Sequence, residues 1–550
     1  MRGWFNSGAP WIWLNAAAVS ASLIMVAGLL GLIALRGLGH FWPTDIVEMD
    51  YRKADDQIVR LIGEIRGHED VPRERLVAAG VSVPGDSELV RRVQLKSGNR
   101  DVVGLDFNWV LGPDIIAERY PEDLVVIERR EWGNFYGYLR EVHENGINVT
   151  DTAPLWDVLN EHLGRARKIA DEIRVIERDE IGAINYKLER LRLDQRRLEL
   201  EGKADTEALA RIAAQEAALQ LQYESHQKRL IALYQDIQRD SVTVEIQDGR
   251  VVELPLSKVI HVLRPNAMGV GDKLLAYMKN VWAFISDDPR EANTEGGIFP
   301  AIFGTVLMVI LMSIFVTPFG VIAAVYLREY AKQGPITRII RIAVNNLAGV
   351  PSIVYGVFGL GFFVYFLGGN IDQLFYPEAQ PAPIFGTPGI LWASLTLALL
   401  TVPVVIVATE EGLARIPSAI REGSLSLGAT KAETLWRTVL PMASPAMMTG
   451  LILAVARAAG EVAPLMLVGV VKLAPTLPLD GNAPFLHLDR KFMHLGFHIY
   501  DVGFQSPNVE AARPVVYATA LLLVLVIVAL NITAISIRNH LREKYRALDN

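Results

Sequence analysis

Arg457 and Glu461 are opposite charges in a stretch that is otherwise apolar, and we expect them near the middle of a membrane span at 444–470. A charged side chain at that depth costs about 2.5–3.5 kcal/mol on insertion scales, so such residues usually face the interior of a helix bundle and pair. Their spacing of four puts both on one helix face. Because arginine stays charged and its planar fork binds two oxygens at once, it is a good phosphate ligand. The pair therefore indicates an anion contact facing a pathway or, alternatively, a buried salt bridge that holds spans together.

Other residues that could do chemistry give weaker signals. His494 and His498 have the spacing of metal ligands, but no carboxylate cluster stands near them. Together with His487 they fit contact with a delivery protein better than metal binding, and we expect no metal site. Four further residues could cap the third span or line a route, although small and aromatic residues are ordinary packing material: Asn345, Asn346, Ser352 and Tyr355.

Several kinds of chemistry are excluded by the sequence. The chain has no cysteine, which rules out disulfides, thiolate metal sites and cysteine nucleophiles. It has no G-x-x-x-x-G-K-[ST] motif and hence no phosphate-binding loop for ATP. Its formal net charge is −7, without a basic patch interleaved with aromatics, which argues against binding of nucleic acid. We expect no cofactor in this chain and no enzymatic activity of its own.

The segment 410–441 joins two apolar stretches and has an informative spacing. Its characteristic residues are Glu422, Gly423, Ser424, Gly428, Leu440 and Pro441. Ser418 is a candidate N-cap for a short helix that ends at Gly428. Thr430, with Glu433 three residues later, predicts a capping box at the start of a second short helix. The segment is therefore predicted to form a compact helix–turn–helix that projects from the membrane.

Two sets of side chains in this helix–turn–helix are expected to point in opposite directions. The apolar set should pack below the helix bundle: Leu425, Leu427, Leu435 and Trp436. The charged set should face outward, where a separate cytoplasmic protein could dock: Arg421, Glu422 and Lys431. The alternative interpretation is an ordinary helical loop.

Membrane spans account for much of the chain, which is 51% hydrophobic. Six segments have the ~20 apolar residues that a helix needs to cross a bilayer: 13–35, 301–327, 350–368, 389–408, 444–470 and 515–537. Lys and Arg concentrate after the second and fourth segments and at the C-terminus. Because loops rich in these residues stay in the cytoplasm, we expect both termini inside and the segments 40–300, 369–388 and 471–514 outside.

The segment 40–299 is dense in charge and is predicted to be an extracytoplasmic α+β insert. Short β-branched runs broken by turn pairs fill 86–150 and 241–264, and the runs on either side of Asp248-Gly249 predict a β-hairpin. Between them, 157–240 is rich in Ala, Leu, Glu, Arg and Gln with leucines at helical spacing. That pattern predicts two long helices folded as an antiparallel coiled coil.

The predicted fold is an all-α polytopic membrane protein with six transmembrane helices and an extracytoplasmic α+β insert containing a coiled-coil hairpin. The N-terminus and first span occupy 1–39, the insert occupies 40–299, and the remaining spans occupy 300–550. The break between the two long helices of the insert is expected near 202–205.

The loop at 410–441 resembles the EAA loop of binding-protein-dependent ABC transporter permeases, in which Glu-Ala-Ala is followed by a glycine and then by Ile-x-Leu-Pro. This chain differs at Gly423, Ser424 and Thr438, which are small-for-small or β-branched replacements. Three further segments resemble the phosphate-transport permease family PstA: Leu347–Gly356, Gly428–Trp436 and Ala456–Leu465. The resemblance covers about 300–540, and the insert resembles the extended N-terminal region of a long-form subgroup.

The resemblance implies a type I ABC permease in the bacterial inner membrane that imports inorganic phosphate by alternating access. It implies a PstB-like ATPase dimer that binds the ATP and docks on the 418–437 part of the loop. A PstC-like permease would complete the path as a heterodimer, and a PstS-like binding protein would deliver phosphate. The implied partners extend to PhoU and a sensor histidine kinase. In this family the residues that match Arg457 and Glu461 look important for transport.

Two other functions stay open at the level of sequence. One is a permease for another oxyanion, such as sulfate or molybdate, which the loop alone cannot exclude. The other is a membrane signalling or scaffold protein of the phosphate-sensing system, whose coiled coil senses the state of the cell envelope. Uptake of the three anions in cells that lack the chain distinguishes these functions.

Overall fold

The structure is a computed structural model that describes residues 7–81, 83, 87–150, 154–506 and 509–546. Its contacts divide the chain into two compact units. One unit, the membrane unit, comprises Met1–His40, Phe284–Pro289 and Gly297–Asn550. The other, the insert unit, comprises Phe41–Ala283 and Arg290–Gly296.

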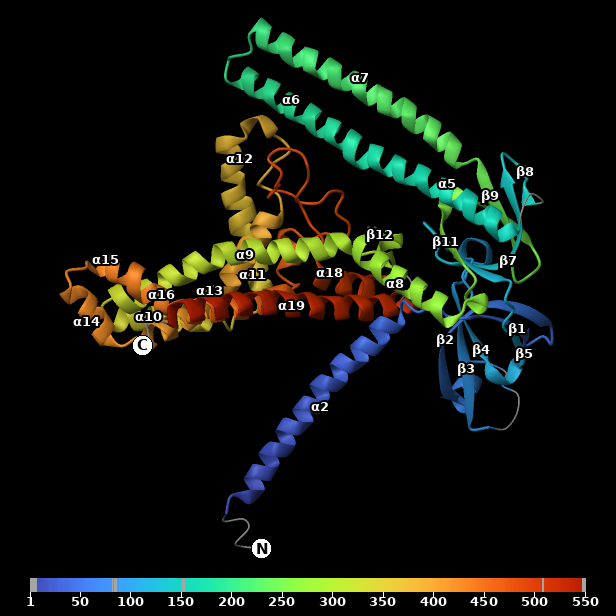
Figure 1. Ribbon diagram of the computed structural model, residues 1–550, viewed down its shortest axis with the longest axis horizontal. Helices are drawn as coiled ribbons and strands as arrows, with labels where there is room; N and C mark the ends of the chain where they lie inside the picture. The colour runs from blue at the N-terminus through green and yellow to red at the C-terminus, as the bar shows by residue number, and fades with distance from the viewer. Residues whose placement is uncertain (1–6, 82, 84–86, 151–153, 507–508, 547–550) are drawn as a thin grey trace. The chain divides into compact units, whose positions relative to one another are not determined.

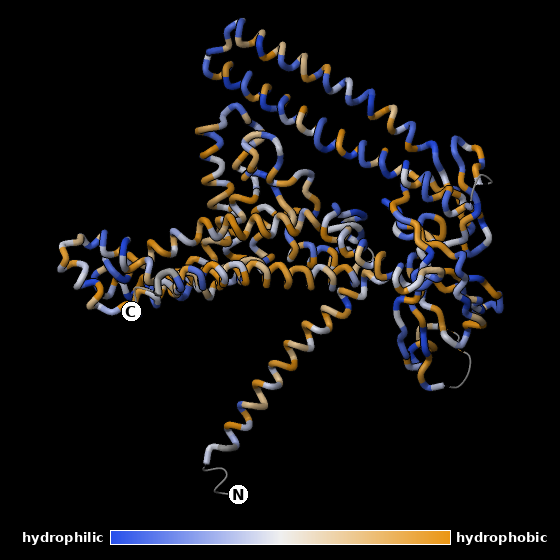
Figure 2. The backbone as a smooth tube through the Cα atoms, viewed as in Figure 1, coloured by the Kyte–Doolittle hydropathy of each residue, from blue (hydrophilic) through white to orange (hydrophobic). Residues whose placement is uncertain are grey.

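Six helices in the described part of the chain are long and apolar enough to cross a membrane. They are Pro10–Gly39, Phe299–Tyr330, Ser352–Phe375, Ile390–Arg415, Lys431–Gly460 and Ala512–Glu543. Figure 2 shows their largely hydrophobic colouring. The six predicted spans are thus confirmed as helices. The predicted end of the fifth span at 470 is wrong, because its helix stops at Gly460.

The membrane unit is built around one central helix. Its long helices are α2 (Ala9–Gly39), α9 (Phe299–Val325), α13 (Ile390–Arg415), α16 (Leu440–Gly460) and α19 (Val509–Arg546). Helix α13 packs on α9 and on α16, α16 packs on α19, and α19 packs on α2 (Figure 1). A Cβ at Gly412 would stand 2.4 Å from the Cβ of Ala446. Small residues thus let α13 and α16 approach closely, as membrane helices commonly do.

Shorter helices complete the membrane unit. The third span joins α11 (Ser352–Phe358), a π-helical segment (Gly359–Gly368) and α12 (Gly369–Phe375). A π-helical turn (Tyr326–Tyr330) ends the second span and leads to the amphipathic helix α10 (Pro335–Leu347). After α16 come α17 (Leu465–Val468), α18 (Leu495–Tyr500) and a π-helical turn (Asp501–Gln505).

The insert unit contains two large antiparallel sheets. The first has the order β4-β3-β2-β1-β5, and its strands are Ile46–Arg52 (β1), Ile58–Pro72 (β2), Leu89–Lys96 (β3), Phe107–Leu111 (β4) and Ile115–Arg119 (β5). The second has the order β10-β9-β7-β6-β11, with β8 on β7. Its strands are Leu124–Arg129 (β6), Phe135–Glu144 (β7), Ile147–Asn148 (β8), Asp240–Glu245 (β9), Val251–Pro255 (β10) and Val259–Leu263 (β11). The β9–β10 pairing confirms the predicted hairpin, whereas β1 and β2 were not predicted.

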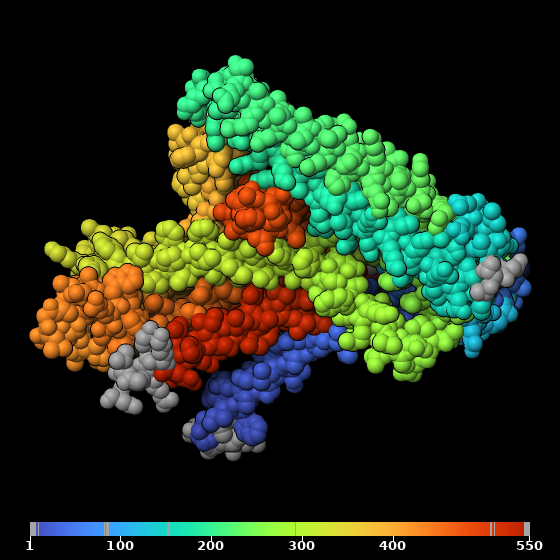
Figure 3. All heavy atoms as spheres, turned by 45° about the horizontal axis from the view of Figure 1, so that its top comes forward, coloured from blue at the N-terminus to red at the C-terminus, as the bar shows by residue number. Residues whose placement is uncertain are grey.

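A long helical hairpin extends from the second sheet. It runs through α5 (Leu155–Val175), a π-helical turn (Ile176–Ile181) and α6 (Gly182–Leu200), and returns through α7 (Thr206–Ile237). The two predicted helices and the break before Thr206 are confirmed, and Figure 3 shows the hairpin as a rod of spheres. Its buried apolar cluster lies near the sheet, with Ile173, Leu230 and Leu233. A coiled-coil seam along the whole rod stays a prediction.

Candidate functional site

The 410–441 loop contains two short helices joined at a glycine. Helix α14 (Ser418–Ser426) ends before Gly428, whose φ of +88° suits a residue without a side chain. Helix α15 (Lys431–Thr434) begins with the predicted capping box. There the backbone N–H of Glu433 donates to Thr430 Oγ1 (3.2 Å), and the N–H of Thr430 donates to Glu433 Oε2 (2.9 Å). The predicted N-cap at Ser418 is wrong, because Pro417 precedes α14 and no side chain caps it.

The second helix of the loop is not separate from the fifth span. After α15 the chain continues through a π-helical turn (Leu435–Val439) directly into α16. Pro441 is the second residue of α16 and follows the π-helical turn without a break, so its missing N–H removes one hydrogen bond inside a continuous helix. The predicted restart of the chain at Pro441 is therefore wrong. A displacement of α15 would be passed to α16 along continuous helix.

The structure brings the predicted loop residues together at one end of α13 and α16. Glu422 and Gly423 are exposed on α14. Ser424 reaches across the turn, where its hydroxyl lies 2.9 Å from that of Thr434. Leu440 packs against a buried cluster that closes the base of the bundle: Leu413, Ile416, Leu435, Val439 and Ala443. The two short helices are thus held as one rigid element.

The side-chain directions predicted for this loop are partly wrong. Leu435 is buried as expected, but Leu427 is 90% exposed, Trp436 is 73% exposed, and Leu425 is exposed as well. Leu425 lies on α14, Leu427 follows its last residue, and Trp436 lies in the π-helical turn after α15. Exposed large apolar side chains beside the exposed Glu422 are typical of an interaction surface. We call Leu425, Leu427 and Trp436 the apolar triplet.

Arg421 points inward rather than outward, and this corrects the prediction for it. Its guanidinium donates to Glu329 Oε1 (2.9 Å) and to the carbonyl oxygens of Leu413 (2.8 Å) and Ile416 (2.7 Å). Lys431 remains exposed, but its ammonium donates to the carbonyl oxygen of Glu329. Glu329, in the π-helical turn after α9, therefore holds both helices of the loop. The contact between Arg421 and Glu329 has no local signal in the sequence, since 92 residues separate the two partners.

Replacement of Arg421 by methionine should loosen α14 while leaving the bundle folded. Loss of the charged hydrogen bonds should lower the free energy of opening α14 by about 2–3 kcal/mol. Hydrogen–deuterium exchange of the 418–427 amides measures this change. Arg415→Met is the matched control, because the exposed Arg415 has the same charge and ends α13. Equal exchange in the two variants would show that the contact between Arg421 and Glu329 does not fix α14.

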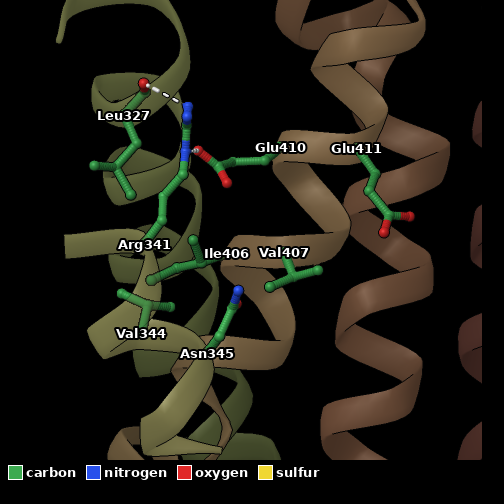
Figure 4. A pocket seen from close by; sticks show the side chains of 8 residues that line it. All are labelled: Leu327, Arg341, Val344, Asn345, Ile406, Val407, Glu410 and Glu411. Atoms are coloured by element: carbon green, nitrogen blue, oxygen red, sulfur yellow. Dashed lines mark hydrogen bonds and ion pairs between the residues drawn. The ribbon is translucent and has the colours of Figure 1, made fainter. Parts of the chain in front are cut away.

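A second ion pair joins α10 to α13 near the end of α13 that leads into the loop. Arg341 Nε lies 3.2 Å from Glu410 Oε1, and Arg341 also donates to the carbonyl oxygen of Leu327 (3.1 Å). A pocket of about 120 Å³ lies beside the pair, lined also by Asn345 and Glu411. Figure 4 shows Arg341 and Glu410 pointing toward each other, with Glu411 directed away. The two ion pairs tie α9, α10, α13 and α14 together at one end of the bundle.

Arg457 and Glu461 lie at the opposite end of α16 from the loop. Arg457 is in the last turn of α16, and Glu461 follows Gly460 outside the helix. The predicted position in the middle of a continuous span is therefore wrong, since the helix breaks between the two residues. Arg457 Nε lies 3.6 Å from Glu461 Oε1, and the side chains are 33% and 22% exposed. The pair is loose enough for the guanidinium to take another anionic partner.

The loop and the charge pair are separated by one helix. At 1.5 Å per residue, the chain from Leu440 to Arg457 spans about 25 Å along α16. The loop and the charge pair are thus far apart in space although they are close in the sequence, and a single helix connects them. Any coupling between the two sites would travel along α16.

The histidine prediction is wrong in one respect. His487, His494 and His498 are all buried, so their rings cannot contact a delivery protein. Burial lowers the pKa of His494 and His498 to about 4, so both rings are neutral near pH 7. Within the described ranges no group of three or more His, Asp or Glu residues could hold a metal ion.

The predicted caps of the third span are also wrong. Asn345 and Asn346 lie in the last turn of α10, whereas α11 begins after Pro351. Tyr355 is buried, and its hydroxyl donates to the carbonyl oxygen of Leu347 (2.5 Å). It therefore fixes the turn between α10 and α11.

Comparisons with known proteins give relatives for the C-terminal half of the chain. Residues 316–547 match the family described as binding-protein-dependent transport system inner membrane component. The chain is 34% identical over 244 residues to phosphate transport system permease protein PstA 1 of Mycobacterium tuberculosis, covering 44% of this chain and 71% of that protein. It is 36% identical over 194 residues to PstA of Mycobacterium leprae, covering 35% and 58%. It is 30% identical over 241 residues to the probable PstA of Methanocaldococcus jannaschii, covering 43% and 74%.

Proposed function

Because the chain belongs to the PstA family of phosphate transport permeases, we propose that it is a permease subunit of an ATP-driven importer of inorganic phosphate. Family membership accounts for the substrate. The observation that carries the mechanism is the geometry of the 410–441 loop. Its apolar triplet is exposed, while Arg421 and Lys431 fasten it to Glu329. An element of this kind can bind a moving partner and pass the movement to the spans.

The partner on this loop is a PstB-like ATPase dimer, which supplies the ATP site that this chain lacks. The residues of this coupling loop are Glu422, Gly423, Ser424, Gly428, Leu440 and Pro441, and its apolar triplet forms the centre of the contact with the ATPase. A PstC-like permease forms the other half of the path, and a PstS-like protein delivers the phosphate. A link to PhoU and a sensor histidine kinase belongs to the same proposal.

The orientation follows from the distribution of positive charge. The loops after α9 and α13 are rich in Lys and Arg, which favours the cytoplasmic side. Both termini and the 410–441 loop then lie in the cytoplasm, and the protein resides in the bacterial inner membrane. The insert at 40–299, with its 157–240 hairpin, lies outside the cytoplasm, between the first span at 1–39 and the five spans of 300–550.

Phosphate meets Arg457 at the end of α16 remote from the loop. The guanidinium supplies two parallel N–H donors for phosphate oxygens. Glu461 is loosely paired with Arg457 and lowers the net positive charge at this position. Phosphate therefore binds weakly enough to be released. ATP binding draws the ATPase subunits together, moves α14 and α15, and rocks α16 so that the path opens on the other side.

Uptake of radiolabelled anions tests this proposal. Cells that lack the chain should lose high-affinity uptake of phosphate and keep uptake of sulfate and molybdate. The intact chain supplied from a plasmid should restore phosphate uptake. Loss of sulfate or molybdate uptake instead would assign a different oxyanion, and unchanged uptake of all three would rule out the transport function.

A further inference from the structure

Helix α8 (Val270–Ser286) carries an exposed apolar stripe in the insert unit. Leu274, Met278 and Trp282 are separated by four residues each, which places them along one side of a helix. Met278 is 60% exposed and Trp282 is 69% exposed, while Leu274 and its neighbour Leu275 are also exposed. An amphipathic helix of a globular domain normally turns such a face toward the core. The apolar face of α8 instead lacks cover from the described residues.

The opposite face of α8 is fixed to the chain that follows the first span. The ring of Tyr277 packs on Phe41 and Trp42, with centroids 6.3 and 6.0 Å apart. Asn280 Nδ2 donates to the carbonyl oxygen of Phe41 (3.1 Å), and Lys273 pairs with Asp45. These contacts determine which side of α8 stays free.

Chain connection alone places α8 near the membrane. Helix α2, the first span, ends at Gly39, and Phe41 is two residues further on. Since two residues of extended chain reach only about 7 Å, the face of α8 that packs on Phe41 stays close to the end of the first span. The exposed Trp42 and Trp282 match the tryptophans that gather at the boundary between membrane and water.

We propose that α8 lies in the membrane–water interface, with Leu274, Leu275, Met278 and Trp282 inserted among the phospholipid headgroups and upper acyl chains. The exposed Asp272 and Lys279 fall beside the stripe, at the edge that faces water. Helices of this type bury their apolar face about 5–10 Å into the boundary region. The insert is then held on the membrane by α8 in addition to its two chain connections. The proposal needs only the membrane spans and is independent of the solute transported.

The occupant is a lipid surface rather than a protein because the short connection through Phe41 keeps α8 close to the end of the first span, where the bilayer begins. The stripe consists of one tryptophan, one methionine and two leucines, whose side chains can pack among the disordered upper acyl chains of a bilayer. Lys279 stands where it can meet the phosphate of a headgroup. A second protein would instead need a surface shaped to fit a single row of side chains.

Spin labelling of the full chain tests the position of α8. The chain has no native cysteine, so a nitroxide attaches only where Leu274→Cys, Leu275→Cys or Met278→Cys provides a thiol. Each labelled chain is reconstituted in vesicles of phosphatidylethanolamine and phosphatidylglycerol. Collision rates with oxygen, which concentrates in lipid, and with a water-soluble nickel chelate are then measured. Lys279→Cys on the same helix is the matched control.

Each outcome of this experiment decides the proposal. Labels at 274, 275 and 278 should collide more often with oxygen than with nickel, and the label at 279 should show the reverse. Frequent nickel collisions at all four positions would place the stripe in water and overturn the proposal. Immobile labels at the stripe that meet neither reagent would show a protein on it, a second copy or another subunit, and would overturn it equally.

Discussion

Arg457→Ala should reduce phosphate uptake at least tenfold while the assembled transporter persists in the membrane. A charge-assisted hydrogen bond contributes about 1.5–3 kcal/mol, which corresponds to roughly a ten- to hundredfold change in affinity. The ion pair with Glu461 contributes little to assembly, because it is loose and both side chains are partly exposed. Radiolabelled uptake measures the first effect, and co-purification of the subunits measures the second.

Two further variants separate phosphate binding from a structural role of Arg457. Arg457→Lys keeps the charge but loses the fork, so it should retain only part of the uptake. If the pair merely holds the spans together, Arg457→Ala should leave Glu461 unpaired, and the additional change Glu461→Ala should restore assembly and uptake. If Arg457 contacts phosphate, the double variant stays inactive. Disassembly of the complex in Arg457→Ala alone would favour the structural role.

The spans were predictable because length and apolar composition determine a transmembrane helix. The end of the fifth span was predicted ten residues too late, since the apolar run continues past the helix to 470. Gly460 and Pro464 were the available signals, because glycine often follows a helix and proline cannot continue one. The error changes the environment of Glu461, which belongs to the connection after α16 and not to the helix.

The features of the 410–441 loop that depend on residues close in sequence were predictable. The capping box of Thr430 and Glu433 involves residues three apart, and the turn at Gly428 depends on one glycine. The inward direction of Arg421 was not predictable, since its partner Glu329 comes from a different span. Sequence patterns assign apolar residues to a core by default, so the exposure of Leu427 was missed.

In the insert, too, local features were predictable and contacts between distant segments were not. The β9–β10 hairpin was predictable from the turn residues Asp248 and Gly249. Strands β1 and β2 escaped notice because charged residues interrupt their apolar positions, as in the run Ile46–Arg52. Their burial depends on the second sheet, which covers Ile46 and Ile62. Pairing between distant segments therefore determined what the local pattern could not.

Leu427→Asp should prevent stable binding of the ATPase subunits and thereby abolish transport. Burial of a leucine side chain contributes about 1.5–3 kcal/mol, and the loss of about 2 kcal/mol weakens binding about 30-fold. Leu427 is almost fully exposed before Gly428 and packs on nothing that the substitution would disrupt. Co-purification of the ATPase and stimulation of its activity by the transporter measure the loss. Trp436→Asp, across the turn, should act in the same way.

Two controls decide whether the loss comes from the interface. An aspartate near the C-terminal end of α14 also opposes the helix dipole, whereas a lysine favours it. Leu427→Lys should therefore weaken ATPase binding as much as Leu427→Asp if apolar contact is what matters. Ile147→Asp introduces the same charge at an exposed apolar residue of the insert and should leave binding unchanged. If only the aspartate at 427 weakened binding, the stability of α14 would be the cause, and the apolar triplet would not be the docking surface.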